Sequence, residues 1–151
     1  MKECTCTPTQ IQKYTSKISG PLLDRIDIHI EVPAVKYQEL SSKRAGEPSN
    51  IVRERVIKAR DIQKERFKNS HGIYKNADMR TKDIRKYCQV DNPSQDLLKM
   101  AMEKLGFSAR AYDRILKVSR TIADLTGSDE IKPEHISEAI QYRSLDRQYW
   151  R

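Results

Sequence analysis

The sequence predicts a mainly α-helical protein, in which a bundle of about five helices follows a short helix and one strand. Charged residues make up 33% of its 151 residues and apolar residues 37%, which is typical of helices with a large solvated surface. Apolar residues recur at helical spacing from residue 49 onward, whereas strict alternation of apolar and polar residues is confined to residues 26–32. These patterns favour a helical body preceded by a small strand-bearing segment.

The first elements are a helix, a turn of helix and the strand. Thr7 and Pro8 form a helix-start signature, so we expect a helix over residues 7–18. Gly20 and Pro21 end that helix and begin a turn of helix through Arg25. A lone strand at residues 26–32 cannot satisfy its own backbone hydrogen bonds. We therefore infer that it belongs to a larger α/β domain.

A loop and a long helix come next. The stretch SSKRAGEPS before residue 50 is small, polar and charged, and predicts a flexible loop or hinge. Ser49 can cap a helix that runs to about Lys68. Val52, Val56, Ala59 and Gln63 are predicted to lie along one face of that helix. Residues 69–80 predict a loop.

Three further helices are predicted between residues 81 and 127. Thr81 is expected to cap a short helix to about Gln89, and Ser94 the next, which ends at Gly106. The apolar stripe of this second helix consists of Leu97, Leu98, Ala101, Met102 and Leu105. Ser108 is expected to open a third helix, Ala109–Thr126, with Gly127 as its stop.

The last predicted helix begins at Lys132 and Pro133. Its inward residues, at helical spacing, are Ile136, Ala139 and Ile140. The inward residues predicted for the preceding helix are Tyr112, Ile115, Leu116, Ser119, Ile122 and Ala123. The two stripes predict one shared core.

The net charge of +8 lies mostly in the predicted helical body. Residues 1–48 hold 7 Lys and Arg against 6 Asp and Glu, and residues 49–151 hold 22 against 15. A basic helical body suits a polyanion such as DNA, RNA or nucleotide phosphates, although a solvated mixed-charge surface has the same composition. No apolar run reaches the length of about 20 residues that spans a bilayer, so we expect a soluble, cytoplasmic chain.

Catalytic and cofactor motifs are few. The five glycines are scattered singly, and no Gly-x-x-x-x-Gly-Lys-Ser/Thr loop occurs to hold phosphates. The three cysteines, Cys4, Cys6 and Cys88, are an odd number, which argues against a disulfide framework. Cys88 is expected to be a small buried thiol on a helix.

Two motifs carry a resemblance to a known family. The segment ISGPLLDRIDIHIEVP, residues 18–33, resembles the part of magnesium-chelatase-type AAA+ ATPases and of MCM helicases that precedes the last core strand. The segment FSARAYDRILKVSRTIADLTG, residues 107–127, resembles the sensor-2 helix of the AAA+ lid. Along almost the whole chain, the sequence is most similar to the magnesium-chelatase-related or ComM-like (YifB) family.

The resemblance implies roles for three arginines. Arg25 corresponds to the arginine finger, which contacts the transferred phosphoryl group from a neighbouring subunit. Arg110 corresponds to the sensor-2 arginine, which contacts the terminal phosphates, and Arg114 is the second candidate for that role. Whether Arg110 acts on the nucleotide of its own subunit or of a neighbour stays open. Without the resemblance, a local ion pair with Asp24, Asp27 or another nearby acid would be the better explanation of Arg25.

Cys4 and Cys6 are a weak candidate for a metal site. Cys-x-Cys alone is a poor indication of zinc binding. The resemblance implies further cysteines upstream in the complete protein, so that four thiolates could hold Zn²⁺ there. No zinc is expected to bind this chain by itself.

The resemblance also implies how the chain is organised and what it does. Residues 1–35 would be the end of the AAA+ α/β core, residues 36–48 a hinge, and residues 49–151 the helical lid. The parent would be a ring-forming ATPase, expected to be hexameric, that uses ATP and Mg²⁺ to remodel DNA as a helicase or by branch migration in natural transformation. The chain alone would be inert.

Other functions remain open from the sequence. A chelatase-type ATPase subunit for metal insertion is one, and a stand-alone basic helical DNA-binding module another. The third is a purely structural module between subunits.

Overall fold

Helices account for nearly all the regular structure. The computed structural model describes residues 4–35 and 46–143. Over these ranges it has seven α-helices and one 3₁₀-helix, and its β-type pairing there is a single parallel bridge between Val90 and Ile131. The elements are α1 (Pro8–Thr15), α2 (Gly20–Leu23), α4 (Ser49–Phe67), η1 (Asn76–Asp78), α5 (Thr81–Tyr87), α6 (Asn92–Leu105), α7 (Ala109–Thr126) and α8 (Pro133–Gln141). The predicted mainly helical fold class is confirmed.

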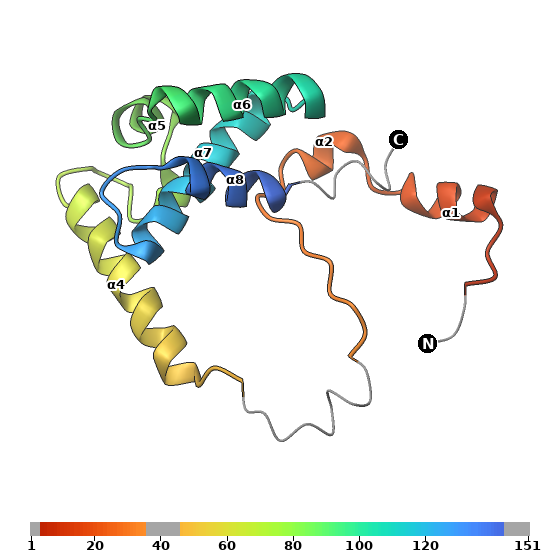
Figure 1. Cartoon of the computed structure of the whole chain (residues 1–151), viewed down its shortest axis with the longest axis horizontal. Coiled ribbons are helices and arrows are strands. Elements are labelled where there is room, and N and C mark those ends of the chain that lie inside the picture. Colours follow the sequence, from red (N-terminus) through yellow and green to blue (C-terminus); the bar gives the residue numbers. More distant parts are fainter. Residues whose placement is uncertain (1–3, 36–45, 144–151) are drawn as a thin grey trace.

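Helix α7 is the central element of the bundle. It packs against α4, α5, η1 and α8, while α6 packs against α8. Figure 1 shows α7 passing through the middle of the bundle, with α4 on one side and α5 and α6 on the other. The predicted inward residues Ile115, Leu116 and Ala123 are all buried, because the apolar residues of α7 recur every three to four positions.

One hydrophobic core joins α4 to α8. Its buried members are Phe67, Ile73, Met79, Ile84, Cys88, Leu98, Ala101, Phe107, Ala111, Ile115, Leu116, Ile122, Ala123, Ile131, Ile136 and Ala139. The prediction of a buried thiol at Cys88 is confirmed, and burial raises its pKa to about 12. None of the described helices combines the length and apolar character needed to cross a membrane.

The ends of α7 follow the predicted signals closely. The Ser108 hydroxyl accepts a hydrogen bond from the Ala111 amide at 3.2 Å, which satisfies one of the free amides of the first turn. Gly127 ends the helix with φ +71, a left-handed conformation that favours glycine. These two residues fix the length of α7, so the position of each arginine along it is also fixed.

Three other predicted caps are wrong by one to three residues. Ser49 and Thr81 are the first residues of α4 and α5 and not their caps. Helix α6 begins before Ser94, because the Asp91 carboxylate accepts a hydrogen bond from the Ser94 amide at 2.9 Å and Pro93 occupies the first turn. The side chain and amide of Ser94, next to the Asp91 carboxylate, lower the pKa of Asp91.

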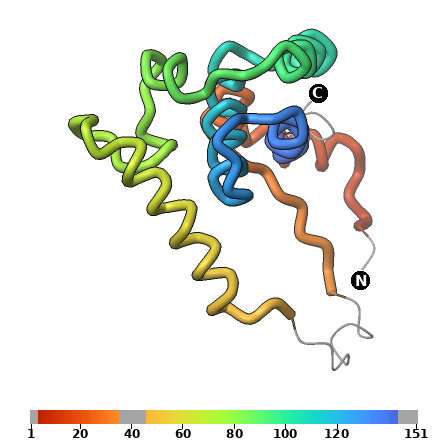
Figure 2. The backbone as a smooth tube through the Cα atoms, turned by 60° about the vertical axis from the view of Figure 1, so that its left-hand side comes forward, coloured from red at the N-terminus to blue at the C-terminus, as the bar shows by residue number. Residues whose placement is uncertain are grey.

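The strand predicted at residues 26–32 does not form. The segment is extended and runs out of the helical body as a single stretch of chain (Figure 2). Its His29 amide donates to the Tyr142 carbonyl at 2.7 Å, and the side chains of Ile30 and Val32 are 68% and 83% exposed. A strand needs a neighbouring strand, and the described residues supply none.

The face of α4 that contains Val52, Val56, Ala59 and Gln63 is buried only over the second half of the helix. Ala59, Gln63 and Phe67 of α4 are buried against the body, whereas Val52 and Val56 are exposed. The reason is geometric: the first half of α4 extends beyond the body on the same side as residues 26–35 (Figures 1 and 2). Val52 and Val56 therefore share a face with Ala59 and Gln63 but are not buried with them.

The boundaries proposed between core remnant, hinge and lid stay predictions. Residues 36–45, which make up most of the predicted hinge 36–48, lie outside the described residues.

Candidate functional site

The predicted arginine-finger residue lies on a tight turn. Helix α2 ends at Leu23, which is buried, and backbone hydrogen bonds from Arg25 to Leu22 (2.9 Å) and from Ile26 to Leu23 (3.0 Å) continue the turn. The side chain of Arg25 is exposed, and its Nη1 donates to the Pro21 carbonyl at 3.4 Å. The turn therefore presents the guanidinium to solvent from a backbone with little freedom.

A buried arginine holds this turn against the helical body. Arg143 is fully buried just after α8, and its guanidinium donates to the Ile26 carbonyl at 2.5 Å and to the Leu23 carbonyl at 3.5 Å. Hydrogen bonds from charged donors are stronger than neutral ones, at about 1.5–3 kcal/mol. Arg143 thus positions the backbone on both sides of Arg25. No motif in the sequence singles out Arg143.

The two sensor-2 candidates have different surroundings. Arg110 is exposed in the first turn of α7. Arg114 lies one turn further along and forms an ion pair with Asp27, whose side chain is 49% exposed. This ion pair joins α7 to the segment that contains Arg25. Arg114 is therefore engaged locally, while Arg110 is oriented toward solvent.

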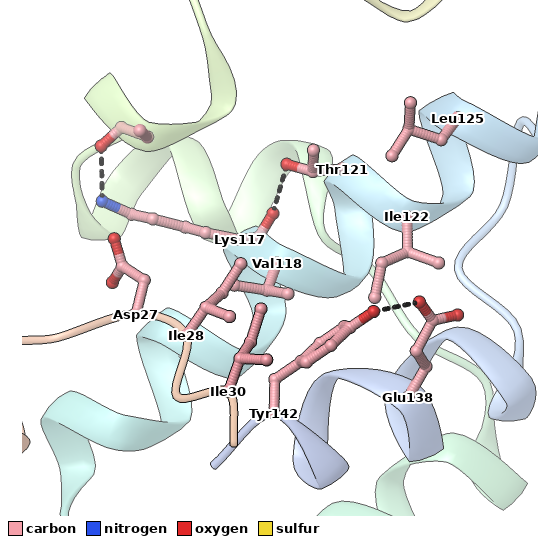
Figure 3. A pocket seen from close by; sticks show the side chains of 11 residues that line it. Asp27, Ile28, Ile30, Lys117, Val118, Thr121, Ile122, Leu125, Glu138 and Tyr142 are labelled. Carbon is pink, nitrogen blue, oxygen red and sulfur yellow. Dashed lines mark hydrogen bonds between the residues drawn. The ribbon is translucent and has the colours of Figure 1, made fainter. Parts of the chain in front are cut away.

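A mostly apolar pocket of about 330 Å³ lies beside this segment (Figure 3). Ile28 and Ile30 line it from the extended segment, and Val118 and Ile122 from α7. Its polar groups already have partners: Asp27 pairs with Arg114, Lys117 donates to the Ala77 carbonyl at 3.0 Å, and the Tyr142 hydroxyl donates to Glu138 at 3.0 Å. Glu138 raises the pKa of Tyr142. The pocket has no arrangement of groups suited to acid–base or nucleophilic chemistry.

Cys4 and Cys6 lie away from the arginines, before α1. Both are exposed. The Cys6 amide lowers the pKa of Cys4 by hydrogen bonding, and Cys4 in turn raises the pKa of Cys6. In the described part of the chain, no three His, Cys, Asp or Glu side chains gather as metal ligands would. Zinc binding with the help of further cysteines stays a prediction.

A buried polar network fixes α7 against α4 and η1. The Asp124 carboxylate accepts from Arg66 at 2.5 and 2.8 Å, from the Asn76 amide at 2.7 Å and from Arg120 Nε at 3.1 Å. Arg120 also donates to the carbonyls of Ser128 and Asp129. Asp124 is 2% exposed and Arg120 3% exposed, so the centre of the network is buried, although Arg66 and Arg120 also line a hollow of about 580 Å³. The i, i+4 spacing of Arg120 and Asp124 was its only signal in the sequence.

The site therefore combines an exposed arginine on an anchored turn with the arginine-bearing start of α7. Residues 46–143 match the model of the family described as magnesium chelatase, subunit ChlI C-terminal. The chain belongs to this family. Residues 1–40 match the model described as magnesium chelatase, subunit ChlI, so the ChlI match continues upstream of the C-terminal family.

Relatives of this chain in the ChlI family are much longer proteins. Competence protein ComM of Haemophilus influenzae is 44% identical over 142 residues, which cover 93% of this chain and 27% of ComM. YifB of Escherichia coli is 40% identical over 143 residues, or 94% of this chain and 27% of YifB. A protein of Mycobacterium tuberculosis is 29% identical over 142 residues. The chain thus spans about a quarter of the length of the curated relatives it matches.

Proposed function

We propose that this chain supplies the arginine finger and the lid of a ring-forming AAA+ ATPase of the ComM and YifB type. The observation that carries the proposal is the exposed Arg25 on a turn that Arg143 anchors and that Asp27 links to α7. A group that acts on a neighbouring subunit has to be accessible and held in a defined position. Arg25 meets both requirements.

The chemistry follows from the properties of guanidinium. Phosphoryl transfer spreads negative charge over the equatorial oxygens of the transferred group, and a planar, permanently charged guanidinium can contact two of them at once. The chain has no Gly-x-x-x-x-Gly-Lys-Ser/Thr loop to hold ATP and Mg²⁺. In this proposal the remaining three quarters of a full-length protein bind the nucleotide, and Arg25 completes the site of the next subunit in a ring, which we propose to be hexameric.

Arg110 is the preferred sensor-2 residue. It is exposed at the start of α7, whereas Arg114 is paired with Asp27. In this proposal Arg110 contacts the terminal phosphates, and their loss after hydrolysis changes the position of the helical lid. Arg114 transmits that change to the Arg25 segment through its ion pair with Asp27.

DNA is the proposed substrate of the motor. One relative is named a competence protein, and the chain has a net charge of +8. The positive charge favours a polyanion as the substrate, and the name of the relative suggests DNA taken up in competence. The activity we propose is DNA unwinding or branch migration in natural transformation. Metal insertion by a chelatase-type complex is the alternative, since the family model bears the magnesium chelatase name.

The test is ATP turnover in a full-length protein that contains this chain. Arg25→Ala is expected to lower kcat by about 10³-fold or more, the effect of an arginine finger, with little change in ATP affinity. Arg25→Lys keeps the charge but loses the planar fork, so it is expected to remain severely impaired. Lys13→Ala, which removes an exposed cation from α1, is the control. Wild-type turnover in Arg25→Ala would refute the finger.

A further inference from the structure

The positive charge of the described helical body is concentrated in one continuous segment. Residues 49–87, from α4 to the end of α5, hold 12 Lys and Arg against 5 Asp and Glu. Residues 88–143 hold 8 against 9. The excess of cations therefore lies on α4, on the loop that follows it and on α5, away from the arginine-bearing start of α7.

Helix α4 separates its charges into stripes. Arg53, Arg60 and Lys64 are spaced by seven and four residues, which places them within about 40° of one another around the helix. All three are exposed. The acidic residues of α4, by the same count, fall about 90° away from this line. The acidic residues are Glu54, Asp61 and Glu65. Opposite charges thus do not cancel along the basic stripe.

The basic stripe leads into a hollow of about 450 Å³ between the second half of α4 and the loop after it. Cations from α4 and its C-terminal end line the hollow, together with the polar residues Asp61 and Ser70 and the apolar or aromatic residues Phe67, Ile73 and Tyr74. The cations are Arg60, Lys64 and Lys68. We call this feature the α4 hollow. Its volume lies in the usual range of ligand pockets, about 300–1,000 Å³.

Tyr74 gives the α4 hollow a chemical preference. Its side chain is 72% exposed, although its amide is held by the Asp78 carboxylate at 3.2 Å. A left-handed glycine, Gly72 with φ +77, turns the loop two residues before Tyr74. An exposed aromatic ring on a held backbone, next to cations, is the combination with which proteins bind single-stranded nucleic acids.

We propose that the α4 hollow binds one strand of nucleic acid, with Arg60 and Lys64 at its phosphates and Tyr74 stacked on a base. The binding site rests on the proposed function, in which DNA is the substrate of the motor. An acidic peptide would satisfy the cations but has no base to stack on the ring. Two cations of the hollow have partners of their own: Lys68 pairs with Glu65 at the surface, and Arg60 donates to Gln63 in a partly buried hydrogen bond. Exposed ion pairs contribute little free energy, so exchanging Glu65 for a phosphate costs little.

The test measures the binding of this chain to a fluorescent 20-nucleotide oligothymidine at several salt concentrations. Each neutralised phosphate contributes about 0.7 to the slope of log K against log salt for single strands. The double variant Arg60→Gln/Lys64→Gln is expected to reduce that slope by about 1.4. Lys99→Gln/Lys104→Gln removes two exposed cations from α6 and is expected to leave the slope unchanged.

Tyr74 separates a nucleic acid from other polyanions. Tyr74→Ala is expected to weaken oligothymidine binding by about 5- to 150-fold, the cost of one stacked base, and Tyr74→Phe is expected to restore it. A poly-glutamate of 20 residues is expected to bind weakly and without dependence on Tyr74. Equal losses in the α4 and α6 double variants, no binding of oligothymidine, or poly-glutamate binding as tight as oligothymidine would each overturn the proposal.

Failure of this proposal is distinguishable from failure of the proposed function. ATP turnover of the full-length protein without DNA depends on Arg25 and not on the α4 hollow. Arg60→Gln/Lys64→Gln with normal turnover and normal oligothymidine binding would reject the hollow alone. Normal turnover in Arg25→Ala would reject the ATPase role and leave the binding result unaffected.

Discussion

Replacing Asp124 by alanine is expected to cost more stability than any other single change to the polar interior. Its carboxylate accepts hydrogen bonds from Arg66, Asn76 and Arg120, and its side chain has no exposed surface. The variant leaves the guanidinium groups of Arg66, 14% exposed, and Arg120, 4% exposed, without their carboxylate. Breaking a buried ion pair in this way costs about 3–5 kcal/mol.

The magnitude is large compared with the total stability of a domain, about 5–15 kcal/mol. With a slope of about 2 kcal/mol per molar urea, the loss moves the unfolding midpoint down by about 2 M. Urea titration followed by circular dichroism measures this directly. Asp96→Ala on α6 is the control, because Asp96 is exposed and surface changes alter stability by about 0.5 kcal/mol or less. A midpoint shift below about 0.5 M in Asp124→Ala would refute the structural role of the network.

Two further predictions concern Cys88 and Arg143. Burial raises the pKa of Cys88 to about 12, so its thiol is neutral in the folded chain. A thiol reagent at pH 8 is therefore expected to modify the exposed Cys4 and Cys6 at once, and Cys88 only after unfolding. The stability contributed by the neutral thiol is complete below pH about 9 and is lost as the pH rises toward 12. Cys88→Ala is therefore expected to weaken the pH dependence of the free energy of unfolding between pH about 9 and 12. An equal pH dependence of stability in both proteins would contradict this. Arg143→Met keeps the volume but removes both hydrogen bonds to the turn, and amide exchange at His29 is expected to become at least tenfold faster while exchange in α7 is unchanged. Unchanged exchange at His29 would mean that Arg143 does not anchor the segment.

Local signals predicted most of the helical body. Ser108, Gly127 and Pro133 fixed the ends of α7 and the start of α8, since caps and breakers act over three or four residues. The cap of α6 was assigned to Ser94 and lies at Asp91, because two capping residues three apart compete and the pattern does not distinguish them. The exposed first half of α4 was not predictable, since its apolar stripe is continuous and only the tertiary fold shows where the body ends.

The candidate site was predicted as residues and not as an arrangement. Arg25, Arg110 and Arg114 were selected from local motifs. The contacts that position Arg25 and Arg114 are long-range. The ion pair of Arg114 with Asp27 spans 87 positions of the sequence, and the hydrogen bond from Arg143 to Ile26 spans 117. No local pattern encodes such separations. The segment at residues 26–32 is extended, as its alternation predicts, but it forms no strand because the described residues supply no partner for it, and we expect that partner in a larger domain.

The central claim, that Arg25 completes the ATP site of a neighbouring subunit, is tested most directly by mixing two inactive full-length variants. One is Arg25→Ala, and the other retains Arg25 but has its nucleotide-binding lysine, upstream of this chain, replaced. If the finger acts between subunits, mixed rings contain intact sites where Arg25 of one variant meets nucleotide bound by the other, and ATP turnover is expected to recover to a substantial fraction of the wild-type rate. If turnover in the mixture stays at the level of the separate variants, Arg25 does not act across the subunit interface.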